Sequence, residues 1–271
     1  MIYGNAGHNP DGKVAAGAVG LIKESTEARK VIKYVKKYIK RSGFGYYDCT
    51  IDNGTNQNDV LVKIRNKVNL KWDDSIKSLM LKGLTKKEAV ESLNKNTLFV
   101  SIHFNSCIND YKGDGVTTGT EVYVYAIRND QANKVATNVC KQIAKLGFKN
   151  RGVKANPSLY VLNSTEPEAI LIECCFVDDA DDVKLYNAKK MGKAIVLGIL
   201  NSYSFTVKTT KKGVYLRKKA AKKIKEAGKL GRLPKGSEFK VSKFKIKSGI
   251  VFGYTNKHHA WVALTNTKIV D

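Results

Sequence analysis

Two histidines of this chain stand where an apolar run gives way to a polar loop. His8 lies in the segment GNAGHNP, and His103 lies in the segment FVSIHFNS. The chain has four histidines, and the other two, His258 and His259, lie in a lysine-rich tail. A catalytic zinc ion takes histidine nitrogen and carboxylate oxygen, with three protein ligands and one position left for water. We therefore expect a zinc site that combines His8, His103 and a carboxylate.

Two glutamates can complete such a site. Glu24 follows His8 by 16 residues, at the start of the first expected helix, and could be the third ligand. Glu173 lies in the apolar run AILIECCF, near the end of an expected strand, where ligands gather in α/β proteins. It could take a proton from the attacking water and pass it to a leaving nitrogen, as amide hydrolysis requires. A single histidine or glutamate of this kind is usually structural or solvated, so the joint placement carries the prediction.

Residues 1–204 alternate short apolar runs with segments of helical period. The strands that we expect are Ile2–Asn5, Gly45–Ile51, Leu98–Phe104, Thr120–Tyr125 and Ala169–Cys174. Apolar spacing and capping residues predict helices over Thr26–Arg41, Gln131–Leu146 and Asp181–Tyr203. This alternation predicts an α/β fold with a mostly parallel, twisted sheet flanked by helices. Residues 54–97 are polar, with a helix expected around Ser75–Asn94, and we expect an insertion or crossover outside the core.

The character of the sequence changes after Tyr203. Short β-type runs separated by Gly, Lys and Asn follow, namely VYLRKKA, EFKVSKFKI, IVFGYTN and AWVALT. Helical periodicity is weak there apart from Lys218–Ala227. We therefore expect a catalytic domain over residues 1–205, a linker over residues 206–211 and a small all-β barrel over residues 212–271.

The net charge of +24 is concentrated in the last quarter of the chain, since residues 205–271 hold 18 Lys and Arg against 3 Asp and Glu. Such a field attracts nucleic acid, anionic lipid or an anionic cell wall. No apolar stretch approaches the length of a membrane span. The N-terminus lacks the basic and apolar segments of a secretory signal, so we expect synthesis in the cytoplasm and release by another route.

The first 204 residues resemble the zinc-dependent N-acetylmuramoyl-L-alanine amidases of the amidase-3 type. Members open with a short strand and a Gly-His loop, here Gly7-His8, and have a glutamate at the next helix, here Glu24. They then carry the motif S-[IL]-H-x-N, here SIHFN at residues 101–105, and an apolar strand that reaches a glutamate, here ILIE at residues 170–173. The resemblance implies zinc bound by His8, Glu24 and His103, Glu173 as the catalytic carboxylate, and Asn105 as a neighbour of the substrate.

The C-terminal region resembles a bacterial SH3-type cell-wall-binding domain. The segments VYLR and AWV stand where such domains have characteristic strands, and the second contains Trp261. This resemblance implies a role for Trp261 in wall binding, and a place in the barrel core is the equal alternative for it.

These resemblances imply a peptidoglycan hydrolase that cleaves the amide between N-acetylmuramic acid and L-alanine by means of a zinc-activated water. They imply a phage endolysin that lyses a Gram-positive host, with peptidoglycan and anionic wall polymers as partners. A host autolysin and a zinc exopeptidase of similar fold remain alternatives. A basic nucleic-acid-binding protein is the alternative from another class, but the large domain has no RNP segment, zinc finger or helix-turn-helix signature, so we expect no nucleic acid as partner.

Overall fold

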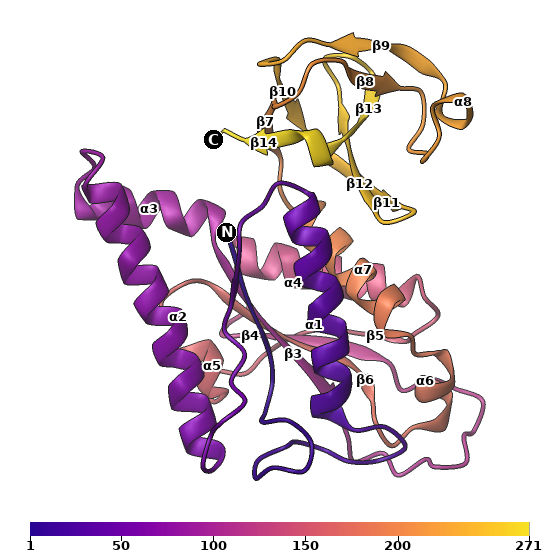
Figure 1. The fold of residues 1–271 in the computed structure, drawn as a ribbon. Helices are drawn as coiled ribbons and strands as arrows, with labels where there is room; N and C mark the ends of the chain where they lie inside the picture. The colour runs from indigo at the N-terminus through magenta and orange to yellow at the C-terminus, as the bar shows by residue number, and fades with distance from the viewer. Residues whose placement is uncertain (271) are drawn as a thin grey trace.

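The computed structural model describes residues 1–270, which form a layered α/β part with an all-β part at one end (Figure 1). Six strands make the central sheet in the order β2-β1-β3-β6-β4-β5. Their bounds are β1 Ile2–Ala6, β2 Tyr46–Asp48, β3 Leu98–Asn105, β4 Thr120–Val124, β5 Asn150–Ala155 and β6 Ala169–Phe176. Strands β2, β1, β3 and β6 are parallel, whereas β4 runs antiparallel to β6 and parallel to β5. The mostly parallel sheet that the sequence predicts is therefore confirmed.

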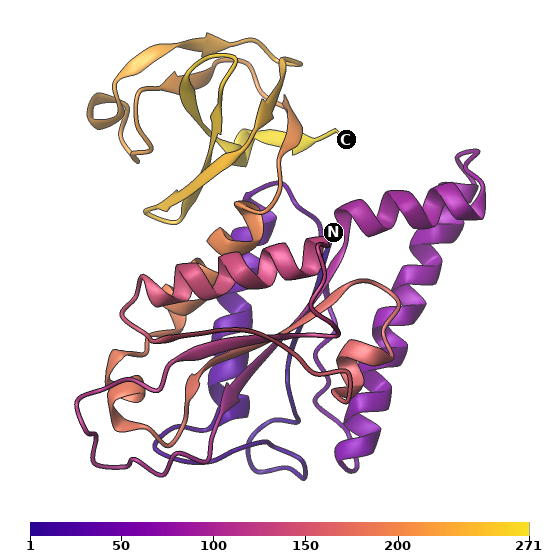
Figure 2. The same ribbon diagram turned by 180° about the vertical axis from the view of Figure 1, so that it is seen from behind.

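Helices cover both faces of this sheet, as Figure 2 shows from behind. The larger core joins the sheet to α1 Glu24–Arg41, α4 Gln131–Ala144 and α7 Ala188–Leu200. The smaller core joins the other face to α2 Gln57–Met80 and α5 Tyr160–Asn163, and α3 Lys86–Asn96 packs beside α2. Within β3, alternate residues serve the two layers, so that Ile102 lies in the larger core and Phe99 in the smaller one.

The expectation that residues 54–97 lie outside the core is wrong. Helix α2 buries a side chain at every fourth position, namely Val60, Ile64, Val68, Trp72 and Ile76. These side chains form much of the smaller core. Lysine, asparagine and aspartate occupy most of the other positions of the helix. Because the buried stripe is only one residue wide, the segment as a whole looks polar in the sequence. The expected helix over Ser75–Asn94 is divided, because Thr85 caps α3 with a capping box to Glu88.

Three further elements differ from the expected ones. Strand β5 was not expected, and it lies at the sheet edge with half-exposed residues, where alternation is weak. The helix expected over Asp181–Tyr203 is two helices, α6 Ala180–Leu185 and α7, because the side chain of Asn187 caps the second one. The segment Lys218–Ala227 has the apolar spacing of a helix, but only its last part, α8 Ile224–Ala227, is helical.

The C-terminal part is all-β, as expected, apart from α8 and a short 3₁₀ turn at Leu264–Asn266. One sheet has the order β10-β7-β14 and the other the order β11-β12-β13-β8-β9. The bounds are β7 Phe205–Thr209, β8 Val214–Arg217, β9 Lys229–Leu233, β10 Glu238–Val241, β11 Lys243–Lys247, β12 Ile250–Thr255, β13 Ala260–Ala263 and β14 Thr267–Ile269.

The segment 206–211, expected as a linker, lies largely within β7 and is a strand of the C-terminal sheet. Phe205, Val207 and Thr209 are buried, and the residues between them are half exposed. This period of two is the pattern of a half-buried strand, and threonine and lysine at the alternate positions give it the composition of a linker.

Aromatic side chains join the two parts of the chain. The Phe44 ring, just beyond α1, meets the Phe205 ring edge-on at 4.8 Å between centroids, and Phe205 stacks on Phe244 of β11 at 5.2 Å. The backbone N–H of Phe244 donates to Asn201 Oδ1 at 3.0 Å, and Arg41 donates to the Gly249 carbonyl at 2.6 Å. Among the residues that the model describes, no helix combines the length and apolar character that crossing a bilayer requires.

Candidate metal centre and active site

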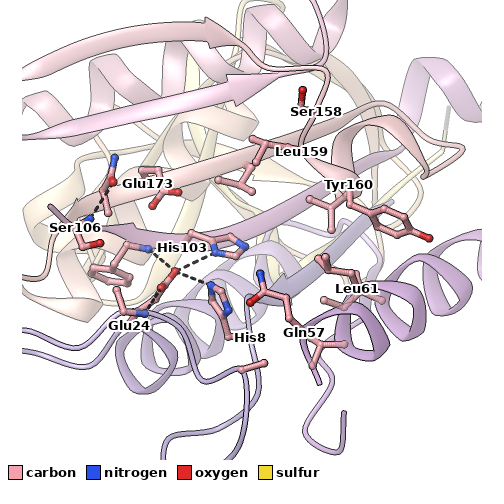
Figure 3. Close-up of a pocket in the computed structure, with 18 residues that line it drawn as sticks. His8, Glu24, Gln57, Leu61, His103, Ser106, Ser158, Leu159, Tyr160 and Glu173 are labelled. Atoms are coloured by element: carbon pink, nitrogen blue, oxygen red, sulfur yellow. Dashed lines mark hydrogen bonds and ion pairs between the residues drawn. The ribbon is translucent and has the colours of Figure 1, made fainter. Parts of the chain in front are cut away.

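Three side chains meet on the smaller-core side of the sheet, beyond the end of β1 (Figure 3). Nδ1 of His103 lies 3.0 Å from Oε1 of Glu24, and Nε2 of His8 lies 3.3 Å from the same oxygen. A ligand atom from each of the three residues lies within 4.8 Å of the other two. Two imidazole nitrogens and one carboxylate converging in this way are a donor set that suits zinc. The structure thus brings together the three ligands that the sequence predicts.

A strained turn aims His8 at the centre. His8 has a φ of 63°, in the left-handed region that residues other than glycine seldom adopt. Neighbouring contacts hold this conformation, since Arg29 of α1 donates to the His8 carbonyl at 2.9 Å. The fully buried Asn9 donates to the carbonyls of Val14 and Gly54, both at 2.8 Å, and so ties the loop to the segment before α2.

Glu24 is fixed by its position at the first turn of α1. Only 4% of the residue is exposed, and its Oε1 accepts the backbone N–H of Phe104 while its Oε2 accepts that of Ala18. Burial raises the pKa of Glu24, but hydrogen bonds from His103 and His8 outweigh burial and hold the pKa far below its ordinary value. Glu24 is therefore a carboxylate that carries its charge at neutral pH, as a metal ligand must.

The ring of His103 is oriented by a neighbour on its own strand. Its Nε2 lies 3.0 Å from Oγ of Ser101, which is fully buried two residues earlier on the same face of β3. Its Nδ1 makes the hydrogen bond to Glu24 described above. In the tautomer that donates from Nε2 to Ser101, Nδ1 would present its lone pair to a metal in place of that hydrogen bond.

Glu173 lies beside this group without belonging to it. It is the direct cross-strand partner of His103 in the parallel pairing of β3 with β6, so both side chains leave the sheet on one face. Its Oε2 is buried and has no hydrogen-bond partner among the described residues. Burial raises the pKa of Glu173 well above its ordinary value, and the charges of Glu24 and Glu121 add to the effect. An unpartnered carboxyl oxygen facing a cavity is available to a water molecule or a substrate.

A cavity of about 410 Å³ opens beside these residues. Its walls come from the three candidate ligands, from α2, from the start of α5 and from the end of β3, and the lining includes Gln57, Leu61, Asn105, Leu159 and Tyr160. In Figure 3, Glu173 and the two histidines lie at one end of the pocket and Tyr160 with Leu61 at the other. The segment thought to be an insertion therefore forms a wall of the site.

Asn105 lines the cavity, and its orientation depends on a residue that the sequence analysis did not single out. Its Nδ2 donates to Oε1 of Glu121 at 2.9 Å, and Glu121 is the cross-strand neighbour of Glu173 in β4. Burial raises the pKa of Glu121, but hydrogen bonds from Lys154, Arg151 and Tyr123 outweigh it and lower the pKa. A lone charged residue inside the strand TEVYV was the available signal.

Trp261 lies in the C-terminal part, at the opposite end of the sheet from the loop that follows β1 (Figures 1 and 2). Only 9% of the residue is exposed, its ring meets Tyr254 at 5.3 Å, and Nζ of Lys245 lies 4.7 Å above it. The ring is thus covered by neighbours and offers little open surface. His258 also lies in this part, where it contacts Phe239.

Gly7 leaves the space that the ring of His103 occupies. A Cβ atom at position 7 would lie 2.1 Å from Cε1 of His103, so the ring would have to move. We expect Gly7→Ala to weaken metal affinity by about 10–100-fold, the range found when the support of a ligand is lost. Titration of the apoprotein with zinc measures this change. Gly231→Ala is the matched control, because a Cβ there makes only an ordinary contact of 3.9 Å. Equal metal affinity in the two variants would contradict the proposed packing.

Comparison with known proteins finds relatives of this chain and structures that share its fold. A catalytic domain of the CD27L endolysin, described as targeting Clostridia Difficile, superposes with a TM-score of 0.57 at 23% identity and covers 74% of this chain and 96% of that one. An uncharacterized protein of Clostridium perfringens is 33% identical over 68% of this chain and 45% of its own length. The endolysin of Bacillus phage SPP1 is 29% identical over 68% of this chain and 58% of its own length. The chain thus spans about half the length of these curated relatives.

The fold is that of an α/β domain with a candidate metal-binding group at one end of its sheet. Residues 2–203 match the family model of the N-acetylmuramoyl-L-alanine amidases, Amidase_3. The chain belongs to this family, and the matched range ends just before β7, so the all-β part lies outside the match.

Proposed function

We propose that this protein is a zinc-dependent N-acetylmuramoyl-L-alanine amidase that degrades peptidoglycan. The observation that carries the proposal is the convergence of His8, Glu24 and His103 beside Glu173, whose Oε2 has no hydrogen-bond partner in the described part of the chain, in a chain of the amidase family. The donor set fits zinc in type and number, and Gly7 and Gly17 leave room for the ligand side chains. When bound, zinc supplies a Lewis acid that polarises the scissile carbonyl and lowers the pKa of water.

The residues of the chain then have separate tasks. The cavity between α2 and α5 binds the muramyl peptide and positions the amide at its inner end. Glu173 accepts the proton of the attacking water and delivers it to the alanine nitrogen as the C–N bond breaks, which balances the hydrolysis. The Asn105 amide, held by Glu121, offers a hydrogen-bond donor at the rim of the same pocket.

We propose further that the protein acts as a phage endolysin on a Gram-positive host, with the C-terminal all-β part as an SH3-like wall-binding module. The similarity to the endolysin of Bacillus phage SPP1 supports this role. In this proposal, residues 1–205 are the catalytic unit, the chain is made in the host cytoplasm, and it acts on the wall after release.

Digestion of purified peptidoglycan tests the activity. We expect new amino-terminal L-alanine and intact glycan strands in the products, both measured by mass spectrometry, without new reducing sugar ends. Release of single amino acids with the muramic acid–alanine bond intact would instead support the exopeptidase alternative.

A further inference from the structure

A row of cationic and aromatic side chains crosses all five strands of the larger C-terminal sheet. Residues directly opposite each other in antiparallel strands place their side chains on the same face. The strand register links one residue of each strand in this way, in the order Lys243, Tyr254, Trp261, Arg217 and Lys229, with a register shift just before Arg217. With strands about 4.8 Å apart, the row is about 19 Å long. We call it the basic row.

Aromatic rings hold the cations of the basic row and its neighbours in place. Each ammonium or guanidinium group lies over a ring, close enough for a cation–π interaction. The distances to the ring centroids are 4.7 Å for Lys245 over Trp261, 5.7 Å for Lys243 over Tyr254, 5.9 Å for Arg217 over Phe252, 4.5 Å for Arg232 over Tyr215 and 5.7 Å for Lys229 over Tyr215. Because these side chains are already held in place, they lose less conformational entropy when an anion binds.

The charge of the basic row is not balanced by carboxylates. Over residues 205–270, the ion pairs that the structure describes join Lys208 to Glu238 and Lys223 to Glu226, away from the row. Next to the Lys229 end of the row, Nε of Arg217 is buried without a hydrogen-bond partner among the described residues, and its Nη1 makes one long contact of 3.5 Å to the Ala221 carbonyl. This guanidinium therefore has donors in place for an anionic ligand.

The exposure of the aromatic rings distinguishes between two classes of ligand. Trp261 is 9% exposed and Phe252 is fully buried, so neither presents an open face. A ligand that binds by stacking, such as a nucleobase on an aromatic platform, needs open rings. Tyr215 and Tyr254 are half-buried, and Arg232 and Lys243 lie over their rings. The exposed groups are Lys229, Arg232, Lys243 and Lys245. A linear polyanion with regularly spaced charges and no bases fits this surface best.

We infer that the basic row binds the phosphodiester polymers of a Gram-positive cell wall, with Arg217 and its neighbouring lysines on successive phosphates. This inference rests on the proposed action on such walls, and it adds the polymer and the residues that recognise it. The ligand chemistry is that of a polyol phosphate chain, and nucleic acid is the competing outcome.

The test compares two variants of the full-length chain that lose the same charge. The row variant carries Lys243→Gln and Arg217→Gln in the row, and Lys245→Gln over the Trp261 ring of the row. The control carries Lys235→Gln, Lys257→Gln and Lys268→Gln, which are exposed lysines in neither the row nor its cation–π contacts. Binding is measured by titration calorimetry with soluble poly(glycerol phosphate), and by cosedimentation on ice with purified walls, native or stripped of phosphate polymers by acid. We expect about tenfold weaker polymer binding in the row variant, as charge-assisted contacts are lost, and less than about a twofold change in the control.

Several results would overturn the inference. They are equal losses in both variants, equal binding of the unmodified chain to native and stripped walls, and tighter binding to single-stranded DNA than to the polymer at equal phosphate concentration. Because Arg217 is partly buried, the variant Lys243→Gln with Lys245→Gln is measured as well, and it should show the same loss in smaller degree. Cleavage of a soluble muramyl peptide is assayed separately, so that a failed amidase proposal is distinguishable from a failed basic row.

Discussion

Glu173→Gln is expected to lower turnover by about 10²–10⁴-fold, the usual contribution of a general base. The amide keeps the shape of the side chain but cannot accept a proton. Since Glu173 lies outside the group of candidate ligands, the zinc content of the variant should not change. Release of amino-terminal alanine from peptidoglycan measures turnover, and elemental analysis measures the metal.

Glu166→Gln serves as the control for this substitution, because Glu166 is exposed and does not line the catalytic cavity. It should retain full activity. A Glu173→Gln protein that cleaved peptidoglycan at the normal rate would remove the general base from the proposed mechanism, while leaving the metal proposal in place.

His103→Ala is expected to abolish metal binding and activity together. The substitution removes one of three ligands, and it leaves Glu24 without the hydrogen bond that helps to hold its pKa low. The unmodified protein should carry about one zinc per chain, as mononuclear catalytic sites do. His258→Ala should keep both metal and activity, since His258 lies in the C-terminal part. Full activity of the unmodified protein in excess chelator, with no metal bound, would refute the zinc proposal.

The sequence predicted that His8, Glu24 and His103 come together, because each of these candidate ligands sits at a recognisable boundary. His8 follows a short apolar strand, His103 lies near the end of another, and Glu24 lies at the first turn of a helix. The supports of these ligands were not predicted. Glu121 acts across neighbouring strands, and their register is not displayed by the sequence. Ser101 lies two residues before His103 on the same strand, and its role depends on how the ring is turned.

Elements with a broad apolar face were predicted from the sequence, and elements that bury only a narrow line of side chains were missed. Helix α1 has a broad apolar face and was expected within two residues of its observed start. Helix α2 buries a single line of side chains. Its other residues are mostly polar or charged, so the sequence pattern indicated neither the full helix nor its place in the core. Strand β7 was hidden in the same way, since its inward residues alternate with threonine and lysine.

The contact of Phe44 with Phe205, which in turn stacks on Phe244, limits how this chain could be recombined. Two of these rings belong to the all-β part, and the third follows α1. A chimera that exchanged everything after residue 204 would leave Phe44 facing a foreign surface, with an apolar ring in water if the new module did not cover it. The unit that can be exchanged is therefore larger than the β-rich segment alone. A chimera with a new C-terminal module should therefore also have a residue after the first helix that matches the surface of the new module.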